Sequence, residues 1–257
     1  MSKFWKKFYL VLVFLFLYAP IIVLMVFSFN EGKTRGNWEG FSLIWYETLF
    51  QDEEVLAAVR NTFLVATLTT LVSTVIGTLG AIGVSQYGWK NRRRILGMNQ
   101  IPVINPDIVM AVGLMVLFRT LTMDFGLVTL TLAHIAFTVP YVVLSVLPKL
   151  KQMPSALPEA AMDLGATPMQ TLWRVVIPQL RPGIITGALI AFTLSIDDFV
   201  ISFFTTGNGV ETVSTTVFAM ARRGINPVIN ALSTMMFAIM LVLLVITNLR
   251  NGKEEQS

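Results

Sequence analysis

The sequence predicts an all-α membrane protein with six transmembrane helices. Hydrophobic residues make up 54% of the 257-residue chain and charged residues only 13%, which excludes an ordinary soluble domain. Long apolar runs recur along the whole chain, and about 20 residues of helix are needed to cross the hydrocarbon core of a bilayer. Because these runs are continuous and do not alternate with polar residues, a helical bundle is favoured over a closed β-barrel.

The apolar runs define six expected spans, at residues 8–29, 62–84, 98–118, 127–147, 184–204 and 229–249. We expect the whole chain, residues 1–257, to form one transmembrane domain with a long cytoplasmic loop at 148–182. Prolines inside the runs are expected to kink or interrupt the helices at Pro20, Pro102, Pro106 and Pro140. The apolar and aromatic segment 41–50 suits a short helix at the outer interface.

The positions of Lys and Arg predict the orientation. With the N-terminus inside, the inner segments hold most of the 19 cations: Lys3, Lys6, Lys7, Lys90, Arg92, Arg93, Arg94, Lys149, Lys151, Arg174, Arg181, Arg250 and Lys253. The outer segments hold Lys33, Arg35, Arg60, Arg119, Arg222 and Arg223. Because cytoplasmic loops are enriched in Lys and Arg, both termini are predicted to be cytoplasmic. The net charge of +4 then reflects topology and requires no nucleic acid.

Two spans carry small residues at every fourth position, namely Ser73, Gly77, Ala81 and Ser85 in one, and Gly183, Gly187, Ala191 and Ser195 in the other. Small residues on one stripe let helix backbones approach closely in lipid, so we interpret the stripes as packing faces. Lining a pore is the alternative. The chain contains no Cys, which excludes disulfides and thiol chemistry.

The loop at 148–182 is predicted to form a helix, a turn and a second helix. Glu159 follows a proline, where a carboxylate favours the N-terminal end of a helix. Gly165 ends the first helix, and Thr167 followed by Pro168 suits the N-cap and first position of the second. A solvated connector is the alternative, but it would not require the apolar residues Leu172 and Trp173.

The loop resembles the EAA loop of permease subunits of binding-protein-dependent ABC importers. Glu159-Ala160-Ala161 is followed at the family's spacing by Gly165 and by Val175-Val176-Ile177-Pro178, although Val175 and Ile177 stand where the pattern favours Ile and Leu. The resemblance implies a MetI-like permease fold in the bacterial inner membrane. It also implies ATPase-coupling residues, which are Glu159, Ala160, Ala161, Asp163, Gly165 and Pro178.

Further segments are similar to those of polyamine (spermidine/putrescine) importer permeases: 105–110, 195–200 and 226–232. The resemblance implies a second homologous permease subunit, an ATPase dimer and an external polyamine-binding protein as partners. The ATPase would bind ATP and Mg, because this chain has no complete nucleotide motif, metal cluster or nucleophile–base pair of its own. We therefore expect a non-catalytic subunit without a cofactor.

A cationic cargo is also indicated by the ionisable residues inside the spans, which are Asp107, Asp197, Asp198 and His134. An Asp at the centre of a membrane helix costs about 2.5 to 3.5 kcal/mol, whereas a Leu or Val gains only about 0.3 to 0.6. The acids should therefore avoid lipid and line a route for cations. Alternatively, they cap broken helices, and the two roles can coexist.

The resemblance also places Ser195, Trp45 and Tyr18 in regions of the substrate route. Trp45, Tyr46 and Tyr18 are candidates for cation–π contacts with an ammonium group, although interfacial anchoring is the usual role of such aromatics. His134 could relay protons or bond a neighbouring helix. Two other functions stay open: an importer of another ligand, and a stand-alone proton-coupled carrier.

Overall fold

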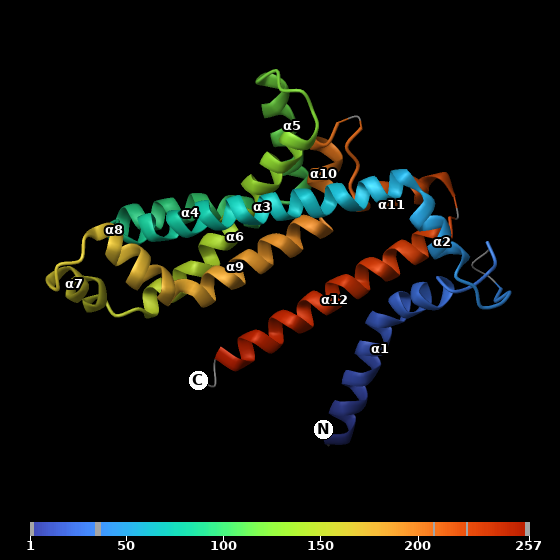
Figure 1. Ribbon diagram of the computed structural model, residues 1–257, viewed down its shortest axis with the longest axis horizontal. Helices are drawn as coiled ribbons and strands as arrows, with labels where there is room; N and C mark the ends of the chain where they lie inside the picture. The colour runs from blue at the N-terminus through green and yellow to red at the C-terminus, as the bar shows by residue number, and fades with distance from the viewer. Residues whose placement is uncertain (1–2, 34–36, 208, 225, 255–257) are drawn as a thin grey trace. The chain divides into compact units, whose positions relative to one another are not determined.

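The computed structural model describes residues 3–33, 37–207, 209–224 and 226–254. Arg35, one of the expected outer cations, lies outside the described residues. The described chain is helical, as predicted, and Figure 1 shows its elements. They are α1 (Lys3–Phe27), α2 (Ile44–Gln51), α3 (Glu53–Ser85), α4 (Trp89–Ile104), α5 (Asp107–Thr120), α6 (Leu127–Gln152), α7 (Ala156–Asp163), α8 (Pro168–Thr171), a π-helical turn (Leu172–Val176), α9 (Ile177–Asp197), α10 (Val200–Thr205), α11 (Val213–Arg223) and α12 (Val228–Glu254).

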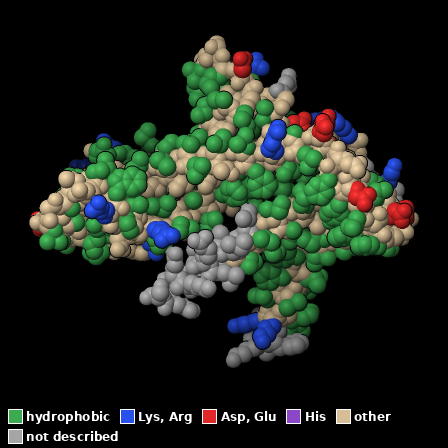
Figure 2. All heavy atoms as spheres, viewed as in Figure 1, with side chains coloured by type: hydrophobic (Ala, Val, Ile, Leu, Met, Phe, Trp, Pro, Cys, Tyr) green, Lys and Arg blue, Asp and Glu red, His purple; other side chains and the backbone are tan. Residues whose placement is uncertain are grey.

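Within the described residues, four helical segments are long and apolar enough to cross a membrane: Trp5–Phe27, Glu53–Ser85, Leu127–Gln152 and Pro168–Asp197. The bent pair α4 and α5 makes a fifth candidate if it is one span. A shorter apolar helix covers Val228–Val242. Figure 2 shows hydrophobic side chains along α1, with Lys side chains at its N-terminal end. Each predicted span lies mostly on helical residues, while the count of six stays a prediction.

The predicted span at 98–118 is not one straight helix. Helix α4 ends at Ile104, α5 begins at Asp107, and their axes differ by 103°. Asn105 and Pro106 between them have extended backbones, with ψ of 144° and 136°. A residue before proline disfavours the helical conformation, and proline has no N–H to donate, so Asn105-Pro106 separates the two helices.

The predicted span at 184–204 is also interrupted. Helix α9 ends at Asp197, Asp198 is extended, and α10 begins at Val200. At its N-terminal end, α9 is joined to the loop at 148–182 through the π-helical turn at Leu172–Val176. The apolar pattern gives no sign of the break, because residues 199–204 are as apolar as the helix before it.

The chain forms two compact units, one of Met1–Ala57 with Thr216–Ser257, and one of Ala58–Thr215. In the first unit, α12 packs against α1 and α2. In the second, α6 and α9 lie side by side and form the most extensive helix pair (Figure 1). The core of this pair includes Val142, Val146, Leu180 and Ala191.

The small-residue stripes lie at this packing interface. A Cβ added to Gly77 of α3 would lie 2.6 Å from Cβ of Val142, and one added to Gly187 of α9 would lie 3.2 Å from Cα of Val142. Both helices therefore approach α6 at the same valine: a Cβ at position 77 would clash with it, and one at position 187 would be tightly packed against it. The prediction that the stripes are packing faces is confirmed at these positions.

Candidate functional site

The break between α9 and α10 gives two adjacent aspartates different surroundings. Asp197 is the last residue of α9, and its side chain is exposed. Asp198 has an extended backbone (φ −67°, ψ 126°), and its side chain is only 6% exposed. A change of backbone conformation between neighbours turns their side chains in different directions, so one carboxylate is accessible and the other is enclosed.

The Asp198 carboxylate caps the start of α10. Its Oδ2 accepts a hydrogen bond from the backbone N–H of Ser202 at 2.7 Å, and its Oδ1 accepts one from Ile201 at 3.3 Å. The first amides of a helix have no partner within the helix, and a carboxylate satisfies them well. The capping role considered for Asp198 is confirmed, while contact with cargo stays a prediction.

His134 of α6 completes a buried polar cluster around Asp198. Its side chain is 1% exposed, and Nε2 lies 3.5 Å from Oδ2 of Asp198. Nδ1 lies 2.7 Å from Oγ of Ser195, and Nε2 lies 3.1 Å from Oγ of Ser202. Bonding to neighbouring helices, one of the two roles considered for His134, is thus confirmed. Ser195 and Asp198 are brought together by this imidazole.

Asp107 is the first residue of α5, directly after the sharp bend, and its side chain is exposed. It makes no side-chain cap for α5, so the capping role considered for Asp107 is not observed. Among the described residues, neither Asp107 nor Asp197 lies within 4.0 Å of a cationic group. Both carboxylates are therefore accessible and unneutralised, in contrast to Asp198.

Trp45 and Tyr18 belong to the other unit of the chain. Trp45 is 8% exposed, and its indole N–H donates to the backbone carbonyl of Asn30 at 2.7 Å. Tyr18 is 45% exposed and stacks on Phe14, with ring centroids 6.1 Å apart. Trp45 therefore has a packing role in its own unit, and a contact of either ring with cargo stays a prediction.

The loop at 148–182 has the predicted helix–turn–helix form. Glu159 lies in the first turn of α7, and Gly165 follows that helix with a φ of +90°, a conformation that glycine adopts most readily. The side chains of Thr167 and Gln170 exchange hydrogen bonds with each other's backbone N–H, of 3.0 and 3.3 Å. This capping box starts α8, with Pro168 as its first residue.

The loop exposes large apolar side chains. Leu164 is 90% exposed, Met169 63% and Trp173 60%. The predicted coupling residues Glu159, Ala160, Asp163 and Gly165 are exposed beside them. A connector surrounded by water would gain nothing from this apolar surface, whereas a docking surface would. The arrangement favours the docking interpretation over the solvated connector.

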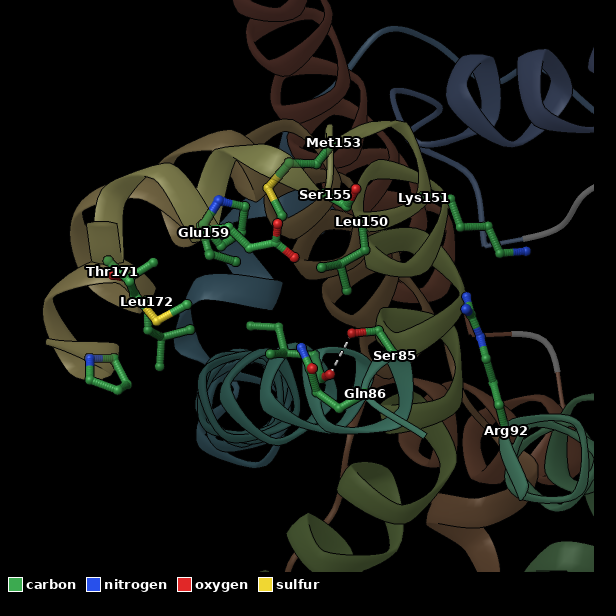
Figure 3. A pocket seen from close by; sticks show the side chains of 15 residues that line it. Ser85, Gln86, Arg92, Leu150, Lys151, Met153, Ser155, Glu159, Thr171 and Leu172 are labelled. Atoms are coloured by element: carbon green, nitrogen blue, oxygen red, sulfur yellow. Dashed lines mark hydrogen bonds between the residues drawn. The ribbon is translucent and has the colours of Figure 1, made fainter. Parts of the chain in front are cut away.

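A cavity of about 570 Å³ lies between this loop and residues of α3, α4 and α6. Figure 3 shows Glu159 of α7 on one side, and Lys151 of α6 and Arg92 of α4 on the other. The apolar part of the lining includes Leu172 and Val176. A cavity with a mixed polar and apolar lining therefore lies next to Glu159, the first of the predicted coupling residues.

Ser202, which belongs to the buried polar cluster around Asp198, was not predicted from the sequence. It lies four residues after Asp198, the spacing at which a capping carboxylate can meet a backbone N–H. Capping of a broken helix was one role predicted for the aspartates, but the sequence does not show that His134 would bring the Ser202 hydroxyl into the same cluster.

Residues 73–251 match the model of the family described as "Binding-protein-dependent transport system inner membrane component". The chain belongs to this family. It is 35% identical over 254 residues to a protein of Haemophilus influenzae named "Spermidine/putrescine transport system permease protein PotC", covering 98% of this chain and 99% of that one. It is 36% identical over 238 residues to the Escherichia coli protein named "Putrescine transport system permease protein PotI", covering 90% and 85% of the two chains.

Solved structures share the fold. A chain of a bacterial ABC transporter that imports the acidic polysaccharide alginate superimposes with a TM-score of 0.74 at 18% identity, covering 99% of both chains. A second structure of a bacterial alginate ABC transporter, in complex with a periplasmic protein bound to an alginate pentasaccharide, gives 0.73 at 19% identity and covers 95% and 92%. The chain therefore has the fold of ABC importer permeases.

Proposed function

We propose that this chain is the permease subunit of an ATP-driven polyamine importer and forms half of its translocation pathway. The 35% identity across 98% of the chain to a spermidine/putrescine permease carries the proposal. The chemistry of the site supports it. Exposed carboxylates without cationic partners, at Asp107 and Asp197, suit weak and successive contacts with an amine cation.

The proposed partners are a second permease subunit of the PotB kind, an ATPase dimer of the PotA kind and an external polyamine-binding protein of the PotD kind. ATP and Mg are bound by the ATPase, and this chain is a non-catalytic membrane subunit. The docking surface is the loop with Glu159, Ala160, Ala161, Asp163 and Gly165, and Pro178 starts the helix that leads back into the membrane. The exposed Leu164 and Trp173 support this assignment.

The proposed topology has six spans in the bacterial inner membrane, with both termini in the cytoplasm. The bent pair α4–α5 is taken as the third span, and α12 as the last. The excess of Lys and Arg in the inner segments supports this orientation.

The cargo is assigned by sequence similarity and by charge, not by fold. The alginate importer has the same fold, and its cargo is an acidic polysaccharide. Exposed carboxylates along a pathway would hinder the passage of an anion, since like charges repel. Asp107 and Asp197 therefore favour a cation over an anion as the transported ligand.

Uptake by the reconstituted complex tests the proposal. The chain would be purified with its companion permease and ATPase and placed in liposomes with ATP inside and the binding protein outside. We expect accumulation of labelled spermidine or putrescine that requires ATP hydrolysis and the binding protein. A non-hydrolysable ATP analogue is the control.

Two results would contradict the proposal. Uptake driven by a proton gradient in liposomes that contain this chain alone would indicate a carrier. ATP-driven uptake of a different ligand, with no polyamine uptake, would keep the importer and reject the cargo.

A further inference from the structure

The imidazole of His134 contacts three separate elements within hydrogen-bonding range. It comes from α6, the helix against which α9 packs, and it reaches Ser195 near the end of α9, Asp198 in the break and Ser202 in α10. The four side chains form a cluster that we call the His134 clamp. Its members are at most 6% exposed.

The contacts of the clamp are consistent with an imidazole that carries a proton on Nε2. Nδ1 lies 2.7 Å from the Ser195 hydroxyl, and the Nε2–H is directed at Ser202 Oγ and the Asp198 carboxylate. The Ser202 hydroxyl in turn donates to the backbone carbonyl of Asp198 at 3.3 Å. With the proton on Nδ1 instead, the Nε2 lone pair would face a carboxylate, which is unfavourable.

We propose that His134 is a positioning residue of the cargo route: the His134 clamp holds the break between α9 and α10, so that Asp197, and not Asp198, presents its carboxylate to the cargo. The proposal rests on the proposed function. Asp198 receives two backbone N–H groups and lies beside the imidazole N–H, so its charge is satisfied inside the protein. Asp197, one residue earlier, is exposed.

The choice of histidine has a physical reason. A Lys or Arg at position 134 would also donate to Asp198, but it would add a permanent positive charge next to the proposed route of a cation. An imidazole supplies the donor without a permanent charge. Its rigid ring also has two nitrogens on opposite sides, which lets one residue connect α9 and α10 at once.

The test uses His134→Gln and His134→Leu in the reconstituted complex. Gln keeps an N–H donor near the place of Nε2–H, whereas Leu keeps the approximate volume and removes the donor. We expect His134→Leu to lower the rate of ATP-driven spermidine uptake about tenfold, because the buried Asp198 carboxylate loses the N–H donor of the imidazole. We expect the uptake rate of His134→Gln to stay within about threefold of that of the unchanged chain.

A second measurement reports position and needs no cargo. The chain has no Cys, so Asp197→Cys introduces a single thiol at the proposed contact. Its reaction rate with a cationic thiol reagent is measured in the complex without polyamine, with Asp124→Cys in the exposed loop before α6 as the control. We expect His134→Leu to change the rate at position 197 severalfold, His134→Gln to preserve it, and neither to change the rate at 124.

The proposal is overturned if His134→Leu leaves both the uptake and the rate at 197 unchanged, or if His134→Gln behaves like His134→Leu. If His134→Leu fails to assemble, Ser202→Ala replaces it, with a smaller change in the same direction expected at 197. No change there would then overturn the proposal. An unchanged chain that imports no polyamine would defeat the proposed function instead, and the labelling result would still decide the role of His134.

Discussion

At the scale of single residues, the two neighbouring aspartates differ in the partners available to their charges. The Asp198 carboxylate accepts hydrogen bonds from two backbone N–H groups of α10 and lies beside His134. Its burial therefore does not leave an uncompensated charge in a low-dielectric interior. Asp197 has no cationic partner within 4.0 Å among the described residues and is exposed. It is therefore the carboxylate of the pair that is available to a ligand.

Replacing Asp197 with Asn should lower polyamine uptake about tenfold, because a charge-assisted hydrogen bond to an ammonium group becomes a neutral one. The initial rate of ATP-driven uptake by the reconstituted complex measures the effect. Asp124→Asn removes the same charge from an exposed loop and should leave the rate unchanged. Equal rates for Asp197→Asn and the unchanged chain would show that this carboxylate does not meet the cargo.

In the proposed coupling loop, Gly165 has a backbone conformation that restricts which residue can occupy its position. Its φ of +90° is strained for any residue with a Cβ, although no atom lies within 4 Å of where that Cβ would be. We expect Gly165→Val to shift the turn, reducing ATP-driven uptake severalfold while the protein still inserts into the membrane. Gly88→Ala, where φ is −59° and the space is also open, should have little effect. Normal uptake by Gly165→Val would remove the coupling role.

At the scale of elements, close packing holds α3 and α9 against α6. Lipid offers no hydrophobic contrast between helices, so their association depends on van der Waals contact, which requires small residues where backbones meet. Val142 of α6 fills the space left by Gly77 on one side and Gly187 on the other. This packing keeps α6 and α9 together beside the His134 clamp.

Gly77→Ala should therefore destabilise the protein, since its Cβ would lie 2.6 Å from Cβ of Val142. Overpacking of this kind costs about 1 to 3 kcal/mol. Thermal unfolding of the purified protein in detergent should show a lower Tm. Gly83→Ala is the matched control in the same helix, because nothing lies within 4 Å of its added Cβ. Equal Tm values for the two variants would contradict the packing described here.

At the scale of the whole molecule, the distribution of charge sets the expected orientation. Lys and Arg are concentrated in the segments assigned to the cytoplasm, and the helices between them carry few charges. A span that reversed would have to move several cations across the bilayer, which is strongly unfavourable.

The orientation is testable because the chain has no Cys. Single cysteines at Lys90 and Ser155 should react with an impermeant thiol reagent only from the cytoplasmic side. Cysteines at Lys33 and Asp124 should react only from outside. All four positions are exposed. Labelling of Lys90→Cys from outside in intact cells would contradict the proposed topology.

Much of the architecture could be predicted from the sequence. The helical class follows from long continuous apolar runs, and the form of the loop at 148–182 follows from Glu159, Gly165 and Thr167-Pro168, whose local chemistry sets helix ends. The small-residue stripes also predicted packing faces correctly. Each of these features depends on neighbours along the chain or on one helical face, so a single sequence is enough to reveal it.

The separation of the two aspartates was decided by tertiary structure, whereas the break at Asn105-Pro106 follows from the proline. The sequence placed Asp197 and Asp198 in one apolar run, and nothing local distinguishes their side chains. Only the arrival of His134 from a helix some sixty residues earlier in the chain, together with the free amides of α10, determines which carboxylate is enclosed. Burial of a charge depends on partners that are distant in sequence, and these become known only when the helices are packed.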